Sequence, residues 1–221
     1  VRFAPAAAGQ YTFRTDCSDT SNPDLHNQQG VLEVAPYSGK NKLFEHGPLQ
    51  VSADKHHLQH ADGTPFFWLG DTWWHGLAGR LRWPQDVQML AADRVAKGFS
   101  LVQIVAGLLP ELVEERFWSE WSANDGGWAW EPGFSRINPR FFDEADLRLG
   151  HLVRVGLAPC IVGAWGYYLK YTGVEKMKQH WRNLVARYGA YPVIWCLAGE
   201  WDMPYYLAED KQAAQKAHQR D

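Results

Sequence analysis

The 221-residue sequence is poor in cysteine, in clustered charge and in long apolar runs, and each absence excludes a class of protein. Cys17, Cys160 and Cys196 form neither a disulfide framework nor a zinc-binding spacing, and the last two are expected to be buried free thiols. A net charge of −3 with scattered basic residues argues against nucleic acid or an anionic membrane as a partner. No apolar segment approaches the roughly 20 residues that a membrane-spanning helix needs.

Targeting and cofactor signals are also missing. The chain opens with Val1 and shows no charged-then-apolar leader, so a secreted, periplasmic or cytoplasmic location is left open. No phosphate-binding glycine motif and no paired-histidine metal motif is found, so we expect no cofactor and no metal.

Tryptophan, in contrast, is abundant, with 12 residues beside 9 tyrosines and 10 phenylalanines. The usual role of a single tryptophan is core packing. An indole in a polar loop can also stack on the apolar face of a sugar while its N–H binds a polar partner. The excess therefore favours a carbohydrate ligand, though it does not establish one.

Residues 1–50 resemble the end of a β-domain. Residues 9–15 and 30–34 read as short strands separated by a turn-rich stretch. Two or three strands cannot close a sandwich, so we expect this segment to be the remnant of an N-terminal β-sandwich domain.

A different pattern begins near Leu58 and repeats three times as a helix, a glycine stop and a short apolar strand. Apolar residues recur at helical spacing, and each glycine is expected to form a left-handed helix cap. The predicted helices cover 84–97, 141–155 and 175–188, each followed by Gly98, Gly156 or Gly189, and the strands lie near 66–71, 100–106, 158–163 and 193–199.

Apolar strands alternating with amphipathic helices predict an α/β fold with a parallel sheet. Four strands and three intervening helices correspond to the N-terminal half of a (β/α)8 TIM-type barrel, which we assign to residues 51–221. A doubly wound open sheet is the alternative, but the sequence after Gly70 reads Asp-Thr-Trp-Trp rather than GxGxxG. Since four strands cannot close a barrel, we expect a longer protein or an association, such as a homo-oligomer.

In such a barrel the catalytic groups lie at the carboxyl ends of the strands. Each predicted strand end here carries a carboxylate, an aromatic residue or both. The long segment after strand two, about residues 108–139, adds four tryptophans and either binds ligand or packs on itself. The predicted substrate contacts are Asp71, Trp73, Trp74, His75, Glu111, Trp128, Trp130, Trp165, Tyr167, Trp201 and Asp202.

Glu200 is the predicted general acid/base. Glycoside hydrolysis needs a proton donor and a second carboxylate, and apolar surroundings keep a donor protonated near neutral pH. Glu200 follows an apolar strand and precedes Trp201, which fits this role; a buried ion pair is the alternative. Asp71 is expected to bind substrate or to belong to a structural network, and His75 to donate to substrate or to pack.

Four segments resemble the apiosidase-like family of glycoside hydrolases. They are GTPFFWLGDTWW (63–74), VQIVAG (102–107), INPRFFD (137–143) and WRNLVARYGAYPVIWCLAGE (181–200). The resemblance covers about residues 58–207, and residues 1–37 resemble the end of the β-sandwich that often precedes the barrel.

The resemblance implies a retaining mechanism with the acid/base after strand four, at Glu200, and a nucleophile from strand seven, which we assign to no residue of this chain. The family's clan usually has Asn-Glu at this position, whereas this sequence has Gly199-Glu200. The expected activity is hydrolysis of a plant or bacterial polysaccharide or of its side chains.

Two other functions fit the same residues. A non-catalytic carbohydrate-binding or adhesion module would keep the aromatic cleft without the second carboxylate. A metal-dependent hydrolase would use Asp71 and His75, but the sequence has no HxH or paired-histidine signal.

Overall fold

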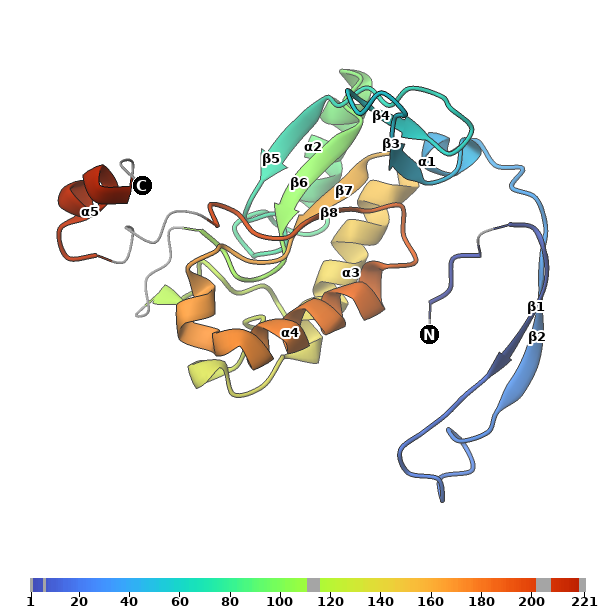
Figure 1. Ribbon diagram of the computed structural model, residues 1–221, viewed down its shortest axis with the longest axis horizontal. Helices are drawn as coiled ribbons and strands as arrows, with labels where there is room; N and C mark the ends of the chain where they lie inside the picture. The colour runs from blue at the N-terminus through green and yellow to red at the C-terminus, as the bar shows by residue number, and fades with distance from the viewer. Residues whose placement is uncertain (1, 6, 111–115, 202–207, 219–221) are drawn as a thin grey trace.

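The centre of the molecule is a four-stranded parallel sheet with helices packed against it (Figure 1). A computed structural model describes residues 2–5, 7–110, 116–201 and 208–218. The strand order β5-β6-β7-β8 follows the chain, as expected for consecutive βα units of a barrel. The strands are β5 (Gly70–Trp73), β6 (Leu101–Val105), β7 (Ala158–Val162) and β8 (Ile194–Cys196).

Three helices connect these strands: α2 (Gln85–Ala96), α3 (Pro139–Arg154) and α4 (Tyr168–Tyr188). Asn138 is the N-cap of α3, because its side chain accepts a hydrogen bond from the Arg140 N–H in the first turn of the helix. One face of β6 and β7 packs against apolar residues of these helices. This main core includes Val102, Ile104 and Ile161 of the strands with Val87, Ala91, Leu149, Leu152 and Leu184 of the helices.

The opposite face of the sheet carries a smaller core. Leu101, Ala158 and Cys160 are buried there, with Ile194 and Cys196 packed against them, and Leu43 covers the amino ends of the strands. Cys160 is a free thiol that is 2% exposed, which confirms the prediction of a buried free thiol. Cys196 is also a free thiol but only half-buried, so the prediction is confirmed in part there.

The segment before the sheet forms two antiparallel hairpins and a short helix. In Figure 1 the first hairpin extends away from the sheet. It has the strands expected near 9–15 and 30–34; the β-sandwich to which we assign them stays a prediction. The elements are β1 (Gly9–Arg14), β2 (Gln29–Val34), α1 (Lys42–Glu45), β3 (Leu49–Val51) and β4 (Leu58–His60).

Two short helices complete the described elements. The turn η2 (Pro132–Phe134) lies in the long segment between β6 and α3, and α5 (Lys211–His218) follows β8. Within the described residues, no helix combines the length and the apolar character needed to cross a membrane.

Two local predictions need correction. The first strand of the sheet, expected near 66–71, runs instead over Gly70–Trp73, because parallel pairing with β6 begins only at Gly70 and Leu101. Gly98 and Gly156 have the predicted left-handed conformation, with φ of 80° and 89°. Gly189 does not, since its φ is −63° and its N–H still bonds the Val185 carbonyl as in a helix.

Candidate active site

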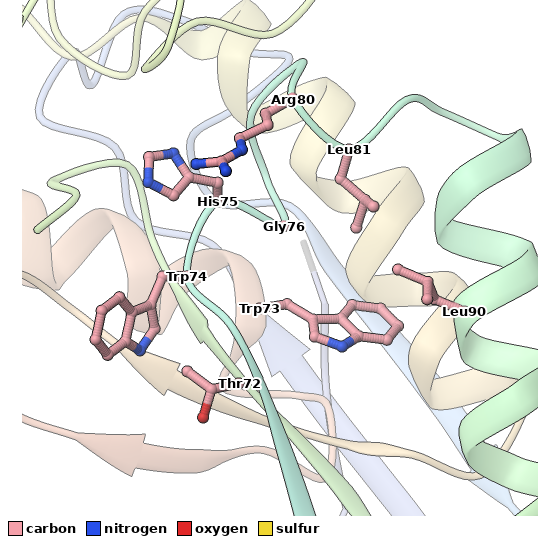
Figure 2. Close-up of a pocket in the computed structure, with 8 residues that line it drawn as sticks. All are labelled: Thr72, Trp73, Trp74, His75, Gly76, Arg80, Leu81 and Leu90. Carbon is pink, nitrogen blue, oxygen red and sulfur yellow. The ribbon is translucent and has the colours of Figure 1, made fainter.

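Side chains alternate along β5, so consecutive tryptophans lie on opposite sides of the strand (Figure 2). Trp73 points toward Leu90 of α2 and is 8% exposed. Trp74 points the other way, away from Leu90, and its ring contacts that of Trp165. The buried position of Trp73 favours a packing role over the substrate contact expected from its place in the sequence.

Asp71 lies two residues before Trp73 and shares its side of the strand. Its carboxylate accepts hydrogen bonds from Trp73 Nε1 at 2.8 Å and from Arg94 Nε of α2 at 2.5 Å. Partial burial opposes ionisation, but these two donors, the Thr72 N–H and the positive charge of Arg94 together keep the pKa of Asp71 below its usual value. This placement favours the structural network as the role of Asp71, and its role as a substrate contact stays a prediction.

Three residues meet beyond the carboxyl ends of the strands and form the strand-end cluster: Trp74 after β5, Trp165 after β7 and Glu200 after β8. The rings of Trp74 and Trp165 contact edge to face, with centroids 5.1 Å apart. Trp165 Nε1 donates a 2.8 Å hydrogen bond to Oε2 of Glu200. Since strand ends carry the catalytic groups in this fold, the cluster is the candidate active site.

Glu200 has an unusual backbone conformation, with φ of +46°. A non-glycine residue in this region costs on the order of 1–3 kcal/mol, and such residues gather at functional sites. The side chain is exposed. The apolar enclosure expected around the proton donor is therefore not supplied by the described residues.

A pocket of about 540 Å³ adjoins Trp74 and includes Thr72, His75 and Arg80 among its lining residues (Figure 2). The Arg80 guanidinium lies over the ring of Trp121, 5.6 Å from its centroid. His75 Nδ1 lies 3.3 Å from the Trp121 carbonyl oxygen. The prediction for His75 as a site residue stays open, because this contact is compatible with packing as well.

Trp121 and Arg80 were missing from the candidates drawn from the sequence. Trp121 is 50% exposed, whereas Trp130 is 3% exposed. The available signal was the polar context of Trp121, which lies between Glu120 and Ser122, whereas Trp130 follows Ala129.

The remaining loop tryptophans are held by hydrogen bonds inside the protein. Trp118 Nε1 donates to the Trp130 carbonyl at 3.1 Å, and Trp128 Nε1 donates to the Ser119 carbonyl at 2.9 Å. Trp130 Nε1 donates to Nδ1 of the buried His180 at 3.2 Å. These contacts favour the self-packed alternative for the loop and give Trp128 and Trp130 a structural role here.

Four further residues were predicted to contact the substrate: Tyr167, Trp201, Glu111 and Asp202. Tyr167 stacks on Tyr168 with centroids 5.2 Å apart, beside the strand-end cluster. Trp201 is 78% exposed and directly follows Glu200. Glu111 and Asp202 lie outside the described residues. Among the residues with described positions, no group of three or more His, Cys, Asp and Glu side chains could hold a metal ion.

Three solved structures with a similar fold are described as glycoside hydrolases. A family 5 glycoside hydrolase from Bacteroides vulgatus is 23% identical, with a TM-score of 0.57 over 73% of this chain and 36% of its own. A protein described as a glycoside hydrolase is 25% identical, with a TM-score of 0.56 over 78% and 37%. A further Bacteroides vulgatus protein, provisionally described as a glycoside hydrolase, is 21% identical, with a TM-score of 0.61 over 98% and 43%.

These similarities place the chain in the class of (β/α)8-barrel proteins to which glycoside hydrolases belong. The chain spans 36–43% of the length of these structures. No curated protein matches the sequence. The model of the apiosidase-like catalytic domain matches residues 52–220, and the chain therefore belongs to the apiosidase-like family.

Proposed function

We propose that this chain contributes the general acid/base of a retaining glycoside hydrolase, and that Glu200 is this residue. The observation that carries the proposal is the strand-end cluster, in which an exposed carboxylate is held by the N–H of Trp165 at 2.8 Å. In a retaining reaction the acid protonates the leaving glycosidic oxygen and later removes a proton from water. Family membership and the family's expected acid/base position support the same assignment.

The proposed substrate is a plant or bacterial polysaccharide or one of its side chains. The partly buried Trp74 and the exposed Trp121 and Trp201 border the region where a sugar would bind. The nucleophilic carboxylate that completes a retaining pair is assigned to no residue of this chain, so the proposal concerns one half of the catalytic pair.

The test is Glu200→Gln in the full-length protein, assayed for kcat/KM on an aryl glycoside that the wild type hydrolyses. Because general acid/base catalysis contributes about 10²–10⁴-fold, we expect a loss of at least about 100-fold. Glu175→Gln is the control, since Glu175 is exposed on α4 and pairs with Lys178. Near-normal turnover of Glu200→Gln would refute the assignment, and a wild type that binds the glycan without cleaving it would favour the binding module.

A further inference from the structure

The indole of Trp165 is placed to act on Glu200 rather than on a sugar. It is 5% exposed, with Trp74 against its ring at 5.1 Å, so it offers no free face on which a pyranose could stack. Its single polar atom, Nε1, is fully used by the 2.8 Å bond to Glu200 Oε2.

Two glycines bring the backbone that carries Glu200 against the segment that carries Trp165. A Cβ at Gly199 would overlap the six-membered ring of Trp165, so only glycine admits the indole there. A Cβ at Gly166 would lie 2.6 Å from the Trp201 Cα. Two backbone hydrogen bonds join these segments: Gly166 N–H donates to the Gly199 carbonyl at 2.8 Å, and Gly199 N–H donates to the Ala164 carbonyl at 2.9 Å.

We propose that Trp165 is a positioning residue for Glu200, and that Gly199 is present to admit its ring. The inference rests on the proposed function. A glutamate side chain loses rotational entropy when it is held in one rotamer. The Trp165 N–H selects one rotamer of Glu200 before the substrate binds, so the loss of side-chain entropy does not add to the activation free energy of the reaction.

The hydrogen bond also distinguishes the two oxygens of the carboxyl group. Oε2 accepts from Trp165, so the transferable proton is carried by Oε1. In the first step that proton moves from Oε1 to the glycosidic oxygen as the bond of this oxygen to the anomeric carbon breaks and the second carboxylate, the nucleophile assigned to no residue of this chain, bonds to that carbon. The products are the Glu200 carboxylate, a neutral alcohol and a glycosyl ester. In the second step Oε1 takes a proton from water as the water oxygen bonds to the anomeric carbon and the second carboxylate is released.

The experiment compares two aryl glycosides of the sugar that the full-length wild type hydrolyses. A 4-methoxyphenyl leaving group needs protonation, whereas a 2,4-dinitrophenyl group leaves without it. Trp165→Phe keeps an aromatic ring but removes the N–H. We expect kcat/KM to fall about 10-fold or more for the methoxyphenyl substrate, as part of the acid-catalysed contribution, and to change less than about 3-fold for the dinitrophenyl one.

Gly199→Ala is the second variant, because its methyl group displaces the Trp165 ring, and it should shift the ratio of the two substrates in the same direction. Trp118→Phe is the matched control: it removes an indole N–H that donates to the Trp130 carbonyl instead of to Glu200, and should leave the ratio unchanged. Equal losses on both substrates, or no loss on either, would refute the positioning role. Failure of the proposed function would show in the wild type itself, as absence of hydrolysis of either substrate.

Discussion

His180 shows how a single buried residue connects the long loop to the site. It is fully buried on α4, and both ring nitrogens are used. Nδ1 accepts from Trp130, so Nε2 carries the proton and donates to the Gly163 carbonyl at 2.8 Å. Gly163 lies two residues before Trp165. Burial lowers the pKa of His180 to about 4, although the bond to Gly163 opposes this.

The pKa of His180 predicts acid sensitivity of the fold. Between pH 6.5 and 4 the unfolded chain binds a proton at this histidine and the folded chain does not, so stability falls as the pH falls. The difference of about 2.5 units corresponds to about 3 kcal/mol. Urea unfolding of the wild type at pH 7 and pH 4.5 should show most of this loss, and His180→Asn should reduce the dependence. His56→Gln, at an exposed position, is the control; an equal reduction there would contradict the assignment.

The sequence predicts where the candidate site residues lie along the strands, but not the side of the strand to which each side chain points. The rule that catalytic groups follow strands selected Trp74, Trp165 and Glu200, which the structure brings together; their role in catalysis stays a proposal. It also selected Asp71, whose side chain faces α2 because it lies within β5 and not at its end. A shift of one residue reverses the face of a side chain, and the sequence pattern does not define strand bounds that sharply.

Among the elements, α3 both covers the sheet and supports the loop after β5. Its Arg148 is 2% exposed and has no ion pair with a described carboxylate. Instead, Nη1 donates to the carbonyls of Gly76, Ala78 and Leu81 at 3.0, 3.2 and 2.5 Å. This loop carries Arg80 and the pocket beside Trp74, so a buried cation holds the edge of the candidate site.

Arg148→Met should therefore loosen the loop more than the rest of the molecule. It removes one donor from each of three carbonyls, of which that of Ala78 keeps the Leu81 N–H. We expect a loss of about 2 kcal/mol in the free energy of unfolding, with faster amide exchange over residues 76–81. Arg82→Met, which removes an exposed ion pair with Asp86, should cost less than about 1 kcal/mol. Unchanged exchange of the loop in Arg148→Met would disprove this bracing role.

At the scale of the whole molecule, the described sheet has two unpaired edges, at β5 and at β8. Unpaired backbone groups beside exposed apolar side chains favour association with another strand. Leu197, directly after β8, is 76% exposed, and Trp201 is 78% exposed. The prediction of a homo-oligomer from an incomplete barrel agrees with these edges but stays a prediction.

The 221-residue chain should self-associate at micromolar concentration, and Leu197→Lys should weaken this association because it places a charge at the β8 edge. Light scattering after size-exclusion chromatography measures the effect. Leu169→Lys on α4 removes an exposed leucine away from the edge and should have little effect. A monomeric wild-type chain, or equal effects of the two substitutions, would contradict the prediction.

The sequence by itself determined the order of the strands and helices of the parallel sheet and the place of Glu200 after its last strand, because helical and strand periodicities and glycine stops are local properties of the chain. The tertiary structure alone decided which tryptophans are buried, that Asp71 pairs with Arg94, and that Trp165 bonds Glu200. Trp165 and Glu200 are 35 residues apart. They meet only because the register of β7 and β8 brings Trp165 opposite Gly199, and no local pattern encodes that register.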